Sequence, residues 1–169
     1  MNLVLICLMT LSNISINNSF ALTDNQKKVI KLCYDESKFF GLEEIIPVMS
    51  LVESSAGVTL VGDNETSFGI LQVKLTTAKW FLEKNEVIID SERLKYLLTY
   101  DNKYCIIVAC SYFNYLLGKN KGDYSKAVLS YNVGLSNVRK NGLFHDPGNY
   151  LVKFNKYKKI IEKEMNYQI

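Results

Sequence analysis

One glutamate of this sequence stands where a carboxyl group could act as a proton donor. Glu53 follows the largely apolar run Val48 to Val52 and precedes the turn residues 54–57. Apolar surroundings raise the pKa of a carboxyl group, and the negative end of a helix dipole acts in the same direction. Such a group can protonate the leaving oxygen of a glycosidic bond. The alternative interpretation is an ordinary surface glutamate at the end of a helix.

Two later stretches carry further groups of chemical interest. Gly62-Asp63 precedes the segment Ser67-Phe68-Gly69-Ile70-Leu71-Gln72-Val73, and residues 127–134 are Ala-Val-Leu-Ser-Tyr-Asn-Val-Gly. Asp63 or Glu65 could supply the second carboxylate that an inverting hydrolase needs to activate water. Asp63 beside a glycine also fits an Asx-turn, so both interpretations stay open.

Helices are expected to hold these groups in place. Capping residues and apolar spacing predict helices over residues 23–40, 47–53, 76–84, 91–98, 101–117 and 123–131, and a last helix that Pro147 opens. Residues 59–73 have turn chemistry and no helical period, with weak strand character only over 68–73. The sequence therefore predicts a mainly α single domain with a small loop or hairpin region beside the cleft.

Most aromatic side chains are expected in the core. The stretch 101–117 is apolar around almost its whole circumference, which predicts a central helix of the domain rather than a membrane span. Tyr112, Phe113 and Tyr115 lie within it, and Trp80 follows the start of another helix. We therefore expect most of the aromatic rings to belong to the core.

Composition limits the classes of function. The 169 residues, 48% of them apolar, suffice for one domain. A net charge of +3 with dispersed lysines argues against nucleic acid as a partner and is compatible with an anionic polymer such as a cell wall. The only histidine is His145, so no cluster has the spacing of metal ligands, and we expect neither metal nor cofactor.

The N-terminal residues resemble an export signal. An apolar stretch too short to span a bilayer is followed by a polar region that ends at Ser19-Phe20-Ala21. This pattern predicts export, with a signal peptide over residues 1–21 and a mature domain over 22–169 that begins at Leu22 and has no stable membrane span. A buried N-terminal helix is the alternative.

Three cysteines remain after residue 21. Cys33, Cys105 and Cys110 cannot all pair within one chain, so at most one disulfide is possible. A bridge would join Cys33 to one of the other two, since Cys105 and Cys110 point apart on one helix. Three buried free thiols are the alternative.

The three motifs together resemble the soluble lytic transglycosylase (SLT) family of the lysozyme-like superfamily. That family has a Glu-Ser at the end of a helix, a Gly-Leu-Met-Gln segment about twenty residues later, and an Ala-Tyr-Asn-Ala-Gly segment beyond a central helix. In this chain the matching residues are Glu53-Ser54, Gly69 to Gln72 and the segment around Tyr131, and the likeness extends over most of residues 25–160. The resemblance implies a lysozyme-like fold and cleavage of the MurNAc-GlcNAc β-1,4 bond of peptidoglycan. It also implies that the exported protein is located in the periplasm or cell wall.

The resemblance also implies roles for individual residues. Glu53 would be the catalytic acid and base, which closes the muramic acid 6-hydroxyl on the anomeric carbon and gives a 1,6-anhydro product. Ser54, Gln72, the backbone around Phe68 and Gly69, Tyr131 and Tyr150 would bind sugar or hold the cleft floor. Gln72 could instead brace its own loop and Tyr131 could be a core tyrosine.

The middle motif departs from the common transglycosylase pattern. Asp63 stands where many family members have a serine, and Gly62-Asp63 with Phe68-Gly69 resembles goose-type lysozymes, in which an aspartate assists hydrolysis. A water-using muramidase is therefore the alternative enzyme, and a non-catalytic wall-binding or assembly protein is the alternative of another class. By analogy with small enzymes of this kind, the partner could be a secretion, conjugation or pilus apparatus.

Overall fold

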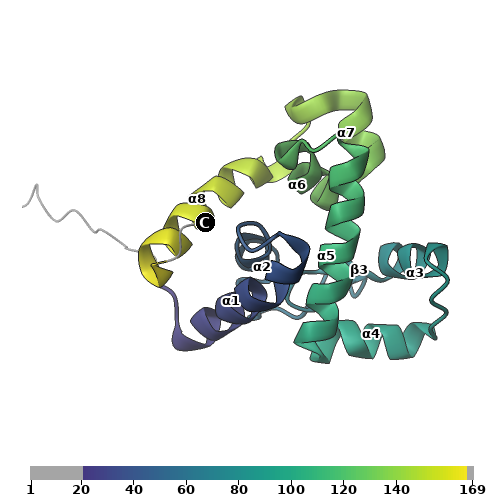
Figure 1. Cartoon of the computed structure of the whole chain (residues 1–169), viewed down its shortest axis with the longest axis horizontal. Coiled ribbons are helices and arrows are strands. Elements are labelled where there is room, and N and C mark those ends of the chain that lie inside the picture. The colour runs from purple at the N-terminus through teal and green to yellow at the C-terminus, as the bar shows by residue number, and fades with distance from the viewer. Residues whose placement is uncertain (1–20, 167–169) are drawn as a thin grey trace, which may run out of the picture.

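The protein is mainly helical, as the sequence predicts. The computed structural model describes residues 21–166, and within that range it contains eight α-helices and one small antiparallel sheet (Figure 1). The helices are α1 (Asp24–Ser37), α2 (Ile46–Ser54), α3 (Leu75–Lys84), α4 (Ser91–Tyr100), α5 (Asn102–Lys119), α6 (Tyr124–Val133), α7 (Leu135–Asn141) and α8 (Tyr150–Met165). Short 3-10 turns cover Lys38–Phe40, Gly142–Phe144 and Pro147–Asn149. The expected signal peptide lies almost entirely outside the described residues.

Helix α1 begins where the sequence indicates. The side-chain oxygen of Thr23 accepts a hydrogen bond from the Gln26 amide at 3.3 Å, and the Gln26 side chain accepts one from the Thr23 amide at 2.9 Å. This reciprocal capping box satisfies two backbone donors that the helix leaves free. The Gln26 side chain also donates to the carbonyl of Ser55 at 3.0 Å, which joins the start of α1 to the end of α2.

The segment predicted as a loop or hairpin contains three two-residue strands. Strand β1 (Val61–Gly62) pairs with β2 (Ser67–Phe68), and β2 pairs with β3 (Val73–Lys74), all antiparallel. Each of these strands is shorter than the stretch 68–73, for which weak strand character was predicted. The reason is a turn at Gly69, whose φ of +78° breaks the extended conformation.

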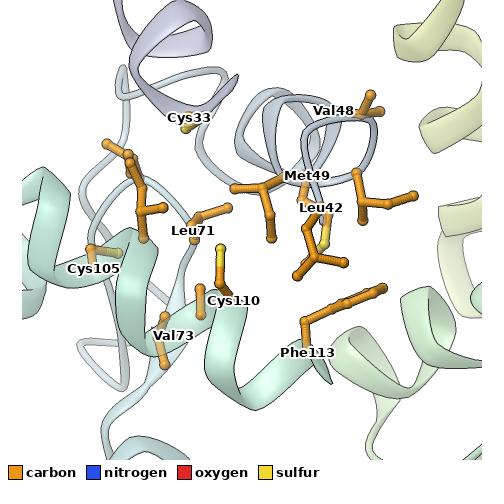
Figure 2. Packing of buried hydrophobic residues seen from close by; sticks show 14 of the residues in the cluster. Cys33, Leu42, Val48, Met49, Leu71, Val73, Cys105, Cys110 and Phe113 are labelled. Atoms are coloured by element: carbon orange, nitrogen blue, oxygen red, sulfur yellow. The ribbon is translucent and has the colours of Figure 1, made fainter. Parts of the chain in front are cut away.

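Helix α5 is the central element, which confirms the prediction from its all-round apolar surface. It contacts α1, α3, α4 and α6, and it crosses the middle of the molecule in Figure 1. Figure 2 shows the core that it forms with α2 and the middle motif, including Phe113, Met49 and Leu71. Phe113 is fully buried, but Tyr112 and Tyr115 are only half-buried and Trp80 is 46% exposed. Phe113 is part of the core and the rings of Tyr112 and Tyr115 pack against it, as expected for most of the aromatic rings, and Trp80 is the exception among these four.

The three described cysteines are free thiols inside this core. Cys33 on α1 and Cys105 and Cys110 on α5 are each fully buried. Burial raises the pKa of the Cys105 and Cys110 thiols to about 12, and it raises the pKa of Cys33 further still. They pack as small apolar groups, which is the second of the two alternatives left open by their spacing.

The last helix closes the structure against the first two. Helix α8 packs on α2 and carries the buried side chains Phe154 and Ile161. Near its end, the Glu164 carboxylate lies 3.4 Å from the ammonium of Lys27 on α1. Among residues 21–166, no helix is long and apolar enough to cross a membrane.

Candidate active site

Helix α2 places Glu53 at the edge of the core. Most of its residues are buried, and the helix is capped by Ser55, which has a left-handed φ of +54° and donates its amide hydrogen to the carbonyl of Ser50. The neighbouring Ser54 hydroxyl donates to the Ile70 carbonyl at 2.7 Å and accepts from the Gly57 amide at 2.8 Å. These bonds fix the position of Glu53 relative to the middle motif.

Burial is the main influence on the Glu53 carboxyl group. It raises the pKa to about 7, with a smaller contribution in the same direction from the charge of Asp63. The hydrogen bond from Tyr150 and the ammonium of Lys74 lower the pKa, because both favour the ionised form. Glu53 can therefore hold a proton or release it near neutral pH, as an acid-base catalyst must.

Tyr150 reaches Glu53 from the first residue of α8. Its hydroxyl donates a hydrogen bond of 2.5 Å to Glu53 Oε1, and its side chain is 5% exposed. The Asp146 carboxylate accepts hydrogen bonds from the amides of Tyr150 and Leu151 at 2.7 and 3.0 Å, which fixes the start of the helix. Burial and the adjacent Glu53 raise the pKa of Tyr150, so its hydroxyl keeps the proton that it donates.

Tyr131 holds the middle motif from the opposite side. Its hydroxyl donates to the carbonyl of Leu71 at 2.9 Å, and its ring lines the same pocket as Glu53. Burial, followed by the nearby charge of Glu53, raises the pKa of Tyr131 well above its usual value. Both tyrosines are therefore neutral groups that face one carboxyl group.

Gln72 and Asp63 lie on the hairpin side of the pocket. The Gln72 amide donates to the carbonyls of Gly69 and Thr59 at 2.9 and 3.2 Å, so it braces its own loop, as one of the two interpretations held. A side chain at Gly62 would collide with the Gln72 amide oxygen. The Asp63 carboxylate is exposed and accepts a hydrogen bond from the Ser67 hydroxyl at 2.9 Å.

The pocket that these residues share has a volume of about 140 Å³ and opens to solvent. It brings together groups from α2, the sheet, α3, α5 and the α6–α7 junction. Its lining consists of Glu53, Asp63, Gln72, Val73, Lys74, Thr77, Tyr112, Tyr131, Asn132, Val133 and Gly134. Within the described part of the chain, no group of three His, Cys, Asp or Glu side chains could hold a metal ion.

The Transglycosylase SLT domain family matches residues 29–145, which is more than half of the chain. The chain belongs to this family. No curated protein and no solved structure matches it. The SLT domain implies lytic transglycosylase activity on peptidoglycan and a location outside the cytoplasm, and the mainly helical architecture with its small sheet is that of the lysozyme-like SLT fold.

The lining of the SLT pocket does not include four residues of the predicted substrate-binding set, namely Ser54, Phe68, Gly69 and Tyr150. Ser54 is 2% exposed and Phe68 is fully buried, so neither side chain lines the pocket. A side chain at Gly69 would strike the carbonyl oxygen of Leu98, since the chain passes very close there. Their predicted role, to bind sugar or to hold the cleft floor, stays a prediction.

The SLT pocket also contains residues that the sequence did not single out. Lys74 and Thr77 lie at the start of α3, and Tyr112 projects from α5. Lys74 directly follows Gln72-Val73, and this place next to a motif could have predicted it as a pocket residue. Tyr112 gave no such signal, because a helix that is apolar all round does not indicate which face borders a cleft.

Proposed function

We propose that the chain is a lytic transglycosylase that cuts the MurNAc-GlcNAc β-1,4 bond and leaves a 1,6-anhydro-MurNAc end, with Glu53 as its catalytic acid and base. The observation that carries this proposal is the position of Glu53 in the pocket, where it is half-buried while Asp63 is exposed, and where its Oε1 accepts the Tyr150 hydrogen bond. Burial raises the pKa of this carboxyl group to about 7. A group of this kind can give up a proton and take one back at the same pH. Membership of the SLT family supports the anhydro product.

The reaction balances with this one carboxyl group. Protonated Glu53 donates its proton to the bridging oxygen, and the bond from that oxygen to the anomeric carbon breaks. The Glu53 carboxylate then takes the proton of the muramic acid 6-hydroxyl, whose oxygen bonds to the anomeric carbon. Tyr150 holds the carboxyl oxygen Oε1 in place through both steps, since it stays neutral and donates one hydrogen bond.

The second candidate is hydrolysis, and the position of Asp63 favours it. Its exposed carboxylate lines the same pocket as Glu53, where it could activate a water molecule on the far face of the sugar. Against it, the Asp63 carboxylate already accepts a hydrogen bond from Ser67, and its φ of +50° fits the turn-forming role.

Mass spectrometry of the fragments released from purified peptidoglycan tests both candidates. We expect products lighter by one water than hydrolysed muropeptides, no products from Glu53→Gln, and little change for Asp63→Asn. Reducing ends that disappear with Asp63→Asn would instead establish a muramidase. Wall binding without any release by the unaltered protein would point to the non-catalytic alternative.

Export and a partner machine form the rest of the proposal. Cleavage before Leu22 would convert its amide, which lies 3.3 Å from Glu164 Oε2, into an ammonium that pairs with that carboxylate. N-terminal sequencing of the exported protein tests the cut, and a start at Met1 would contradict it. Local wall opening for a secretion, conjugation or pilus apparatus rests on family analogy. A strain that lacks this protein and has lost the function of such an apparatus would support it if the wild-type protein restores that function and Glu53→Gln does not.

A further inference from the structure

Aromatic rings form a continuous band that leaves the active-site pocket along α5 and α3. Tyr131 and Tyr112 line the pocket with their ring centroids 5.9 Å apart. Tyr112 stacks on Tyr115 at 6.2 Å with an angle of 19° between the planes, and Tyr115 meets the ring of Trp80 edge to face at 5.7 Å. Trp80 is 46% exposed, so the band runs from the pocket to open solvent.

Two lysine ammonium groups lie over the outer end of this band. Lys84 Nζ is 4.7 Å from the Tyr115 ring centroid and 5.2 Å from that of Trp80, and Lys119 Nζ is 5.4 Å from Tyr115. A ring face attracts a cation but accepts no strong hydrogen bond from it, so the ammonium donors stay available.

The charge on these two lysines is not neutralised by the protein. Among the described residues, neither has a carboxylate within 4.0 Å, whereas five other lysines lie within that distance of an acidic side chain. The outer end of the band thus combines an exposed aromatic surface with two unpaired positive charges. An elongated ligand with apolar faces and negative groups would complement both features.

We propose that Trp80, Tyr115, Lys84 and Lys119 form a second binding site for the glycan strand, which accepts a sugar unit carrying an anionic stem peptide. This inference rests on the proposed function, because the band begins inside the pocket where the strand is cut. The sugar face would pack against the Trp80 ring, and the carboxylates of the stem peptide would pair with the two ammonium groups. The continuity of the band with the pocket favours the substrate itself over a separate protein partner.

Binding is best measured in the Glu53→Gln protein, which holds strands without cutting them. Its affinity would be compared for glycan strands that carry stem peptides and for strands from which the peptides have been removed. We expect the double substitution Lys84→Gln with Lys119→Gln to weaken binding of peptide-bearing strands by about tenfold and to leave binding of bare strands unchanged. Trp80→Ala should weaken binding of both by about threefold to tenfold.

A matched control is available on α4. Lys95 also lies over an aromatic ring, with its Nζ 5.3 Å from the centroid of Phe68, but it is outside the pocket lining and the band. Lys95→Gln removes the same charge from a different surface and should not change either affinity. Thermal unfolding of each variant verifies that a loss of binding is not a loss of fold.

Several results would overturn the proposal. One is that the double variant binds peptide-bearing strands as tightly as its parent does. Another is that the double variant loses affinity equally for both kinds of strand. A third is that Lys95→Gln loses as much affinity as the double variant. Failure of the Glu53→Gln protein to bind any strand would also overturn it. The products released by the unaltered protein decide the proposed cleavage separately, so the two ideas can fail independently.

Discussion

The hydrogen bond from Tyr150 and the burial of Glu53 have opposite effects on the pKa of the Glu53 carboxyl group. Burial raises the pKa of Glu53, and the Tyr150 hydrogen bond lowers it. Replacing Tyr150 with phenylalanine keeps the ring and removes the donor, so the pKa of Glu53 should rise. We expect the alkaline limb of the kcat/KM profile of Tyr150→Phe to move to higher pH, with a plateau lower by about tenfold because Oε1 loses its orienting bond. A limb that stays in place or moves to lower pH would contradict this role.

The same carboxyl group should reduce stability at alkaline pH. The pKa of Glu53 is about 7 in the folded protein against 4.5 as its reference value, so between these values the folded state binds the proton more tightly than the unfolded chain. Stability from this group is therefore lost as pH rises from 4.5 to 7 and stays lost above. We expect Glu53→Gln to be more stable than wild type by about 1–3 kcal/mol at pH 8, with no such gain at pH 4.

Urea unfolding of both proteins at the two pH values measures this difference. A gain of equal size at pH 4 and pH 8 would show that the effect has a cause other than ionisation. The wild-type protein is expected to be the less stable one because it must keep an ionised carboxylate in a buried place, and such a loss of stability is common for active-site groups.

Site residues that lie within short sequence motifs could be predicted from the sequence, whereas site residues on the face of a regular helix could not. Glu53, Asp63, Gln72 and Tyr131 stand in the three motifs, and the structure brings all four to one pocket. The direct bond from Tyr150 to Glu53 could not be derived, because it depends on how α8 packs on α2, 97 positions away in sequence. Sequence spacing says nothing about such a distant contact.

At the scale of elements, the turn between β2 and β3 depends on a glycine. Gly69 has a φ of +78°, and an added Cβ would clash with the carbonyl oxygen of Leu98 and approach Cys105 Sγ to 2.8 Å. We expect Gly69→Ala to destabilise the protein by about 2–4 kcal/mol, since both the backbone and the packing must change. Thermal or urea unfolding measures the loss.

Gly118 provides the matched control within α5. An added Cβ there meets nothing within 4 Å, and the position is helical and exposed. Gly118→Ala should therefore stabilise the protein by about 0.5–1 kcal/mol. A similar loss of stability in both variants would refute the special role of Gly69.

Helices with a cap or an apolar period were predicted to within a few residues, whereas α7 and the exact extent of the strands were not. Helices α1, α5 and α8 have caps or apolar spacing that fix their extent within a few residues. Helix α7 was not predicted, because its seven residues bury only Val138 and so lack an apolar stripe. The two-residue strands are held by pairing with each other, which local sequence does not encode.

At the scale of the whole molecule, the thiols report whether residues 22–169 form one cooperative domain. Cys33 belongs to α1, whereas Cys105 and Cys110 belong to α5, and all three share one core (Figure 2). We expect negligible alkylation of these three thiols in the native protein, because burial raises their pKa values and blocks access. All three should become reactive over the same narrow range of urea concentration, as read by mass spectrometry of each labelled peptide. Labelling of Cys33 at a lower urea concentration than the other two would show that α1 opens separately.

The position of Tyr150 has a consequence in time. A chain that crosses a membrane N-terminus first delivers Glu53 early and the start of α8 some hundred residues later. Until that helix docks, the carboxyl group has neither its hydrogen-bond partner nor its full covering of protein. On the proposed function, cleavage therefore requires that residue 150 has followed Glu53 across the membrane and that α8 has docked, so a chain exported only up to residue 149 would lack the hydrogen bond that orients Glu53.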